Sequence, residues 1–274
     1  QGLKPLGEVE AEIARRTASD LSEIQLKSIP DEIRPLIDRL NHLFKMLRGA
    51  QASQQRFIAD AAHQLRTPLA GLRTQLDLAS TEPSSQIGQQ RLELVDEAAS
   101  RIEHLLTQLL SFARAEAGPP VGVEFDLVQL LNIAEESAST FLDKALARDI
   151  DLGFRIEPAC VKGVAWMIRE ATANLIDNAI RYTPRGGEVT VACGTVADEP
   201  FIEVEDSGPG IPTEHEGLVF ERFFRIPGTP GNGCGLGLPI VKEIARFHNA
   251  QVTLDRSSSG GVRARIAFPK TAVR

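Results

Sequence analysis

A histidine and a threonine stand four residues apart in the stretch His63-Gln64-Leu65-Arg66-Thr67-Pro68-Leu69. Residues at this spacing share one face of a helix, and the apolar periodicity around them places both side chains away from the apolar side. A neutral imidazole, with an ordinary pKa near 6.5, is a competent nucleophile at neutral pH. The alternative is a plain surface histidine. We give that interpretation to the other four, which are His42, His104, His215 and His248.

A second polar pattern runs along a predicted helix further down the chain. Glu170, Asn174, Asn178 and Arg181 recur at intervals of three or four residues, and Tyr182 follows directly. Carboxamide oxygens are hard ligands suited to Mg²⁺, and a guanidinium suits phosphate. Apolar residues fill the opposite face, so an ordinary solvated helix face is the alternative.

Two glycine-rich segments follow. Asp206-Ser207-Gly208-Pro209-Gly210-Ile211 comes directly after a predicted strand and can aim one carboxylate into a pocket, where an exocyclic amine would donate to it. Gly231-Asn232-Gly233-Cys234-Gly235-Leu236-Gly237 opens a helix, where free N–H groups favour phosphate oxygens. The latter lacks Rossmann and P-loop spacing. A tight turn and a flexible linker are the respective alternatives. Between them, Phe220–Arg225 is a candidate anchor for a mobile lid.

Composition narrows the classes of function. A chain of 274 residues predicts about two domains. Its net charge of −7 disfavours nucleic acid as a partner and requires local groups to hold any anionic ligand. Three dispersed cysteines, Cys160, Cys193 and Cys234, indicate reduced thiols and a cytosolic compartment. No apolar run reaches membrane-spanning length, and the start at Gln1 suggests a fragment whose membrane segment would lie upstream.

The first half of the chain is predicted to be helical. Helices are expected over Pro5–Arg16, from Asp31 to Leu47, over 53–81, and from about Leu92 to Ala113 with an end near Gly118. The last two carry heptad seams. The first seam is Ile58, Ala62, Leu65, Leu69, Leu72, Leu76 and Ala79, and the second is Leu92, Val95, Ala99, Ile102, Leu106, Leu109 and Ala113. Two stripes cannot close a core alone, so a dimeric four-helix bundle is expected.

The second half mixes helices and strands without strict alternation, which predicts an α+β sandwich with one layer of each. The expected helices are Phe125–Ala147, Val164–Arg181 and Leu238–Phe247. The expected strands are Ile150–Ile156, Glu188–Gly194, Phe201–Asp206, Val252–Arg256 and Val262–Phe268.

In this order and spacing, the motifs together resemble those of the sensor histidine kinases of bacterial two-component systems. The corresponding H, N, G1, F and G2 boxes are His63–Leu69, Glu170–Tyr182, Asp206–Gly210, Phe220–Phe224 and Gly233–Gly237. The resemblance implies a HAMP-like signal-relay module over 1–52, a dimerisation and histidine-phosphotransfer hairpin over 53–118, and a Bergerat-type (GHKL ATPase) catalytic domain over 119–274. It also implies a homodimer, a response-regulator partner, and a full-length protein anchored in the bacterial inner membrane with this portion on the cytoplasmic face.

Roles follow from the resemblance residue by residue. His63 would be the phosphoacceptor, and Thr67 would position water for dephosphorylating the response regulator. Glu170 would be a further catalytic residue. Asn174 would ligate Mg²⁺, and Asp206 would read adenine. The remaining residues of the implied ATP site are Asn178, Arg181, Tyr182, Gly208, Gly210, Ile211, Gly233, Gly235, Leu236 and Gly237.

One residue departs from the family pattern: Gln64 stands where an acidic residue usually follows the phosphoacceptor. Two other functions remain open. One is an ATPase of the gyrase or Hsp90 type, which the His63 hairpin disfavours. The other is a non-catalytic dimer scaffold, which the intact Asn174, Asp206 and glycine set disfavour.

Overall fold

The computed structural model describes residue 15 and residues 20–24, 33–81, 86–119, 122–229 and 233–270. Nearly all of the predicted helix Pro5–Arg16 therefore lies outside the described residues. The chain divides into two compact units, Gln1–His63 and Gln64–Arg274. In the part of the chain that is described, no helix combines the length and the apolar character needed to cross a bilayer.

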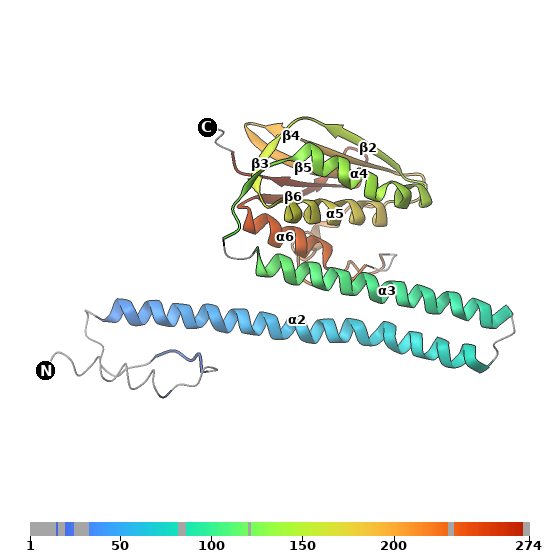
Figure 1. Cartoon of the computed structure of the whole chain (residues 1–274), viewed down its shortest axis with the longest axis horizontal. Helices are drawn as coiled ribbons and strands as arrows, with labels where there is room; N and C mark the ends of the chain where they lie inside the picture. The colour runs from blue at the N-terminus through green and yellow to red at the C-terminus, as the bar shows by residue number, and fades with distance from the viewer. Residues whose placement is uncertain are drawn as a thin grey trace. The chain divides into compact units, whose positions relative to one another are not determined.

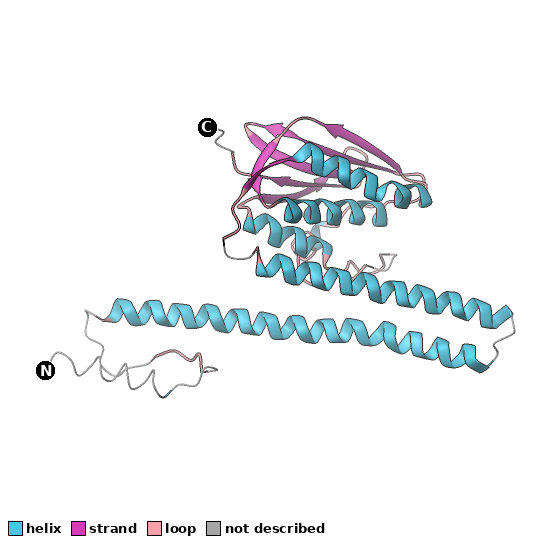
Figure 2. Cartoon of the chain, in the orientation of Figure 1, coloured by secondary structure: helices cyan, strands magenta, loops and turns pink. Residues whose placement is uncertain are grey.

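Two long helices make up the hairpin (Figures 1 and 2). The helix α2, Arg34–Thr81, is continuous over 48 residues and joins the two helices expected before and after residue 50. Pro68 lies within it, where it has no N–H to donate to the carbonyl of Gln64. The helix α3, Gln86–Ala117, ends where expected, at Gly118, whose positive φ of 68° suits a residue without a side chain.

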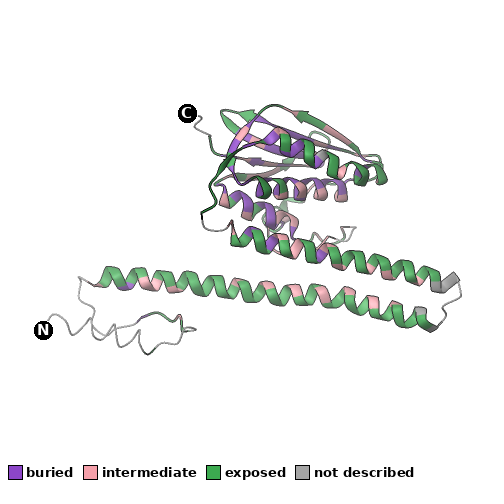
Figure 3. Ribbon diagram, in the orientation of Figure 1, coloured by how far each residue is buried: buried purple, intermediate pink, exposed green. Residues whose placement is uncertain are grey.

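Along each predicted seam, half-buried residues lie between exposed ones (Figure 3). Leu65 and Leu72 of α2 and Val95, Ile102 and Leu109 of α3 are half-buried. The seam residues between them are exposed, and these are Ile58, Ala62, Leu69 and Leu76 on α2 with Leu92, Ala99, Leu106 and Ala113 on α3. Each helix thus keeps one apolar row that this single chain leaves uncovered.

The sandwich consists of a five-stranded sheet with helices on one face (Figure 1). In spatial order the strands are β2 (Asp151–Ile156), β4 (Glu188–Val196), β5 (Glu199–Asp206), β7 (Val262–Ala267) and β6 (Gln251–Arg256). The pair β2–β4 is parallel and the others are antiparallel. The covering helices are α4 (Leu130–Ala147), α5 (Ala165–Tyr182) and α6 (Gly237–Phe247), and a single 3-10 turn, η1, spans Thr213–His215. The expected layer arrangement is confirmed.

One predicted element was wrong in part. The segment expected to be a helix from Phe125 begins instead with the strand β1, Asp126–Gln129, and the helix starts at Leu130. β1 pairs antiparallel with β3, Cys160–Gly163, a strand that the sequence did not indicate. Strand pairing overrides the local helical periodicity here, because its hydrogen bonds come from a segment more than thirty residues away.

The core lies between the sheet and α5 and α6. Ile168, Ile176 and Ile180 of α5 are completely buried, as are Ile240 of α6 and Ile202 of β5. Burying an aliphatic side chain of this size contributes roughly 1.5–3 kcal/mol. This packing fixes the face that α5 turns toward the sheet, and hence the face that it leaves for ligands.

A histidine in the same core corrects a second expectation. His248 is not a surface residue, since only 2% of it is exposed. Its Nε2 accepts from the backbone N–H of Val164 (3.0 Å), and its Nδ1–H donates to the carbonyl of Ile244 (2.8 Å). The rings of Phe125 and Phe268 pack around it. Burial lowers the pKa of His248, so the neutral imidazole is the native form.

This burial makes the sandwich sensitive to acid. The unfolded chain binds a proton at His248 below about pH 6.5, whereas the folded chain resists it. Stability is therefore full above that pH and is lost as the pH falls toward the lowered native pKa, with a slope of at most about 1.4 kcal/mol per pH unit.

We expect His248→Gln, which keeps an acceptor for Val164 but does not titrate, to flatten this part of the pH dependence. The measurement is guanidinium unfolding followed by the fluorescence of Trp166, the one tryptophan in the chain, at several pH values. His42→Gln, at an exposed position on α2, is the matched control. An unchanged slope in His248→Gln would contradict the assignment.

Candidate nucleotide-binding and phosphoacceptor site

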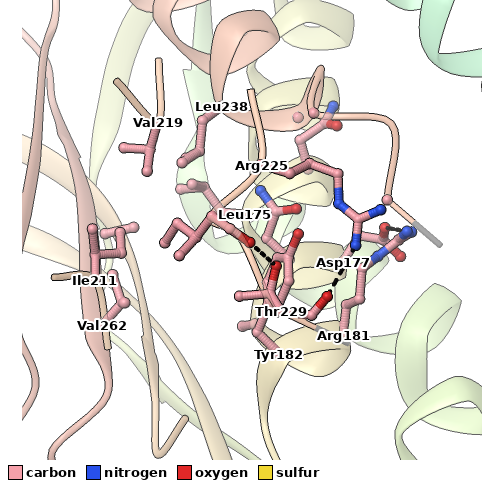
Figure 4. Close-up of a pocket in the computed structure, with 18 of the residues that line it drawn as sticks. Leu175, Asp177, Arg181, Tyr182, Ile211, Val219, Arg225, Thr229, Leu238 and Val262 are labelled. Carbon is pink, nitrogen blue, oxygen red and sulfur yellow. Dashed lines mark hydrogen bonds and ion pairs between the residues drawn. The ribbon is translucent and has the colours of Figure 1, made fainter. Parts of the chain in front are cut away.

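One pocket collects most of the predicted nucleotide-site residues (Figure 4). It lies beside α5, the end of β5, and the segment leading into α6. The predicted residues that line it are Asn174, Asn178, Arg181, Tyr182, Asp206, Gly210, Ile211, Gly233, Gly235 and Gly237. Of the others, Gly208 bonds to Asp206, Leu236 is fully buried, and Glu170 bonds to Asn174. Gly231 and Asn232 lie outside the described residues.

The Asn174 side chain has its amide nitrogen fixed and its oxygen left for a ligand. Its Nδ2 donates to the backbone carbonyl of Glu170 (2.8 Å) and to the Glu170 carboxylate (3.3 Å). These bonds set the amide orientation, so the oxygen is the atom available in the pocket. A buried amide oxygen held in this way fits a divalent cation, which takes oxygen ligands. Glu170 thus orients the side-chain amide of Asn174.

A glycine at the start of α6 leaves room beside the two asparagines. A Cβ on Gly237 would come within 2.9 Å of Nδ2 and 3.2 Å of Oδ1 of Asn178, and within 3.4 Å of Oδ1 of Asn174. A side chain at this position would displace the Asn178 amide and would lie directly against that of Asn174. The first N–H groups of α6 also lack helical partners, which suits an anion at this point.

The carboxylate of Asp206 is buried at the end of β5, with 8% of the residue exposed. Its Oδ1 accepts from the N–H groups of Gly208 (2.8 Å) and Val262 (3.1 Å). Oδ2 accepts no hydrogen bond from the residues that the structure describes. Burial raises the pKa of Asp206, and the two N–H groups oppose that rise. One oxygen is thus anchored, and the other is available to a donor on a ligand.

The guanidinium of Arg181 is held by Asp177 on the same helix, and Asp177 in turn contacts Lys144 on a neighbouring helix. Its Nη2 lies 2.7 Å from Asp177, one turn earlier on α5, and Asp177 also bonds to Lys144 of α4. Burial alone would raise the pKa of Asp177, but Arg181 and Lys144 together hold it below its usual value. Sequence reasoning gave Asp177 no role. The i,i+4 spacing between Asp177 and Arg181 is the sequence signal that could have identified this ion pair.

The helix α3, in the same Gln64–Arg274 unit, also reaches this pocket through His104 and Gln108. Arg181 Nη2 lies 2.9 Å from His104 Nε2. A guanidinium only donates, so Nε2 must be the acceptor, and the ring proton sits on Nδ1. Burial, and then the nearby Arg181, lower the pKa of His104, which keeps it neutral. The expectation of a plain surface role for His104 was wrong, and no local pattern marks it.

A backbone hydrogen bond connects the predicted lid anchor, Phe220–Arg225, to the glycine-rich segment Gly233–Gly237. The N–H of Phe223 donates to the carbonyl of Gly235 (2.9 Å), and both residues have positive φ. A Cβ on Gly235 would lie 2.6 Å from the carbonyl oxygen of Phe224, so only glycine fits. Of the remaining histidines, His215 is also only partly exposed and stacks against Phe224 at 5.6 Å. His42 is exposed as expected.

A second contact ties the lid anchor to α3. Arg222 bonds to Glu116 at 2.8 Å, and its guanidinium lies 4.5 Å from the ring centre of Phe112, which is buried. The predicted lid anchor therefore contacts α3 directly through Arg222.

Apolar residues supply the other wall of the pocket, and sequence reasoning found only Ile211 among them. The additional apolar lining residues include Leu175, Val204, Val219, Leu238, Leu254, Val262 and Ala264. Several of these appear in Figure 4 opposite the Arg181 side of the pocket. An apolar wall with one buried carboxylate suits a flat heterocycle that carries an N–H donor.

His63 lies on α2 with its side chain exposed, and Thr67 is exposed one turn later, as the spacing predicted. Gln64 is exposed as well. The nucleophile candidate is thus open to solvent and sits on the helical hairpin, separate from the pocket residues in sequence.

An ATPase-like sandwich preceded by a helical hairpin with an exposed histidine defines the catalytic core of a histidine kinase. Family models agree. Residues 163–272 match the histidine kinase-, DNA gyrase B- and HSP90-like ATPase domain, which binds ATP. Residues 53–118 match the His Kinase A phospho-acceptor domain, and residues 3–48 match a PhoQ-like HAMP domain. The chain belongs to the sensor histidine kinases and carries these three domains.

Curated relatives include the sensor protein kinase PmrB of Pseudomonas aeruginosa, 38% identical over 99% of this chain, and the sensor histidine kinase CusS of Escherichia coli K12, 32% identical over 98%. The chain spans 57% of the length of each. Among solved structures, the histidine kinase ThkA in complex with the response regulator TrrA has the same fold (TM-score 0.68, 22% identity, 82% of this chain and 64% of that one).

The tight space at Gly237 gives a direct test of the site. We expect Gly237→Ala to lower ATP affinity in the presence of Mg²⁺ by about tenfold or more, because the added methyl displaces the Asn178 amide and fills the space beside Asn174. Gly217→Ala is the matched control, since a Cβ there meets nothing within 4 Å. Calorimetric titration of both variants with ATP, with and without Mg²⁺, provides the measurement. Equal affinities for the two variants would rule out this geometry.

Proposed function

We propose that this chain uses ATP to phosphorylate His63 and passes the phosphoryl group to an aspartate of a response regulator. The observation that carries the proposal is the combination, in one chain, of an exposed histidine on a helical hairpin with a pocket built for a nucleotide. The pocket offers an apolar wall and one available carboxylate oxygen at Asp206, and amide and guanidinium groups from α5.

The reaction needs little covalent chemistry from the protein. A lone pair on one ring nitrogen of His63 attacks the γ-phosphorus, the P–N bond forms, and the bond from phosphorus to the β,γ-bridging oxygen breaks with ADP leaving. Such a transfer depends on in-line geometry and on charge neutralisation. His63 lies on α2, outside the residues that line the pocket, so transfer requires the γ-phosphate of the bound nucleotide to reach this side chain in line.

The α5 stripe would hold the triphosphate end. Asn174, with Asn178 beside it, offers an amide oxygen to Mg²⁺, and Arg181 offers the guanidinium nitrogens that Asp177 and His104 do not occupy. Mg²⁺, when bound, would neutralise charge on the phosphates. Tyr182 and the Gly233–Gly237 segment close the phosphate side, while Asp206 accepts from the amine of adenine.

The same chain is proposed to act as a homodimer. The exposed rows on α2 and α3 leave their leucines, which are Leu69, Leu76, Leu92 and Leu106, between 43% and 54% exposed. A second copy would cover these rows by completing a four-helix bundle. The His63 hairpin is then the docking surface for the response regulator, for which the complex of ThkA with TrrA is a precedent in that relative. Thr67, one turn from His63, would position water when the regulator is dephosphorylated.

The domain limits that we propose are 1–52, 53–118 and 119–274. Since the chain spans little more than half of its curated relatives, we propose that the whole protein continues upstream into a membrane-anchored sensor with this portion on the cytoplasmic side of the inner membrane.

The first test separates the nucleophile from the nucleotide site. His63→Ala should abolish transfer of label from [γ-³²P]ATP to the protein while leaving ATP affinity unchanged. His42→Ala, at an exposed position on the same helix, should keep wild-type labelling. Labelling of His63→Ala would exclude this nucleophile. ATP hydrolysis by the wild type without any phosphoprotein would support the gyrase-like or Hsp90-like alternative instead.

The second test addresses Gln64. Its amide oxygen can accept from the imidazole and fix the tautomer, but it cannot take up the proton. We expect an active kinase with a slow phosphoryl step, which Gln64→Glu accelerates, within the range of about 10²–10⁴-fold that general bases contribute. Initial labelling rates at saturating Mg-ATP measure the effect. Equal rates for wild type and Gln64→Glu would show that residue 64 takes no part in the chemistry.

A further inference from the structure

The hairpin between β6 and β7 contacts the residue that is proposed to read adenine. Ser257, in the turn of this hairpin, is 6% exposed, although serine is usually a surface residue. Its Oγ donates to the backbone carbonyl of Asp206 (2.7 Å) and accepts from the N–H of Gly261 (2.9 Å). One hydroxyl therefore bonds across the turn to Gly261 and, at the same time, to the end of β5.

These bonds replace strand pairing at the point where it stops. The ladder between β5 and β7 ends at the pair Glu205–Arg263, one residue before Asp206. Beyond it, the N–H of Val262 bonds to the Asp206 side chain, not to a main-chain carbonyl. Oδ1 of Asp206 thus accepts the bond that a backbone carbonyl accepts elsewhere in the ladder. The backbone carbonyl of Asp206 accepts from the Ser257 hydroxyl instead.

The approach of the two segments is very close. A Cβ on Gly261 would overlap both the carbonyl oxygen and Oδ1 of Asp206 and would lie 2.6 Å from the N–H nitrogen of Gly208. Only glycine allows the turn to approach this carboxylate. The neighbouring Ser258 and Ser259 are exposed, and Ser259 lies 3.5 Å from the same carbonyl. Ser257 is thus the buried member of the serine run, and it makes the shorter bond.

We propose that Ser257 is a positioning residue for base selection: by fixing the turn against Asp206, it directs Oδ1 into the fold and leaves Oδ2 for the amine of the base. This inference rests on the proposed role of Asp206. Without the hydroxyl, the Asp206 carbonyl loses its 2.7 Å bond and keeps only the longer contact with Ser259, and the turn loses the side-chain acceptor of the Gly261 N–H while its backbone bonds remain. The carboxylate then rotates more freely, and the amine of adenine no longer meets a fixed acceptor.

The test compares ATP with ITP, whose base carries an oxygen where adenine carries the amine. Calorimetry on the whole chain gives the Kd for both nucleotides in wild type, Ser257→Ala, Ser257→Thr and Ser258→Ala. The ratio of the two Kd values does not depend on the fraction of folded protein, because both nucleotides report on the same folded molecules. A variant with reduced stability thus remains informative.

We expect wild type, Ser257→Thr and Ser258→Ala to prefer ATP, and Ser257→Ala to lose most of that preference, with an ATP affinity about tenfold weaker and an unchanged ITP affinity. A Ser257→Ala protein that keeps the wild-type ratio, or that loses affinity for both nucleotides equally, overturns the positioning role and leaves the proposed role of Asp206 intact. A wild type that binds ATP and ITP equally overturns the role of Asp206, and with it this inference.

Discussion

The packing of α5 against the sheet is the constraint on which the nucleotide site depends. This helix buries Ile168, Ile176 and Ile180 on one face and carries Asn174 and Arg181 on another. Successive residues of a helix are about 100° apart, so a rotation by one position would turn the amide into the core. The apolar face therefore sets the direction of every polar group that α5 contributes, and the binding geometry is a consequence of core packing.

Because the whole protein is negatively charged, the pocket has to supply its own positive charge to hold an anionic ligand. With a net charge of −7, the chain has no general attraction for a triphosphate. Arg181 is a local cation in the pocket, and Asp177 and His104 hold it in place. A side chain already fixed in one geometry loses less conformational freedom when a ligand binds. Asp177 offsets part of the positive charge, while Lys144 on the other side of Asp177 restores some of it.

Much of the fold and site was predictable because the signals were local. The heptad rows of α2 and α3, the polar stripe of α5 and the strand before Asp206 all repeat with the period of their own element. The failures share one cause, which is distance along the chain. β1 needs β3 as its partner, so the local pattern at residues 126–129 was misread as helix.

The two misassigned histidines show the same limit. His104 and His248 look like ordinary polar residues in sequence, yet one contacts Arg181, 77 residues away, and the other bonds to Val164, 84 residues away. The division of each heptad seam into a half-buried and an exposed row also required the structure. Sequence periodicity shows which residues are apolar, but not which neighbour covers them.

The single available oxygen of Asp206 has a consequence for inhibitor chemistry. A compound that fills the apolar wall beside Ile211 and Val262 but presents no N–H at this point leaves a buried acceptor without a partner, at a cost of about 1–3 kcal/mol. Enlarging the hydrophobic part of such a compound offsets that cost only slowly. Fragment screens against this pocket should therefore favour aminopyrimidine-like and aminopurine-like rings over pure hydrocarbons of the same size.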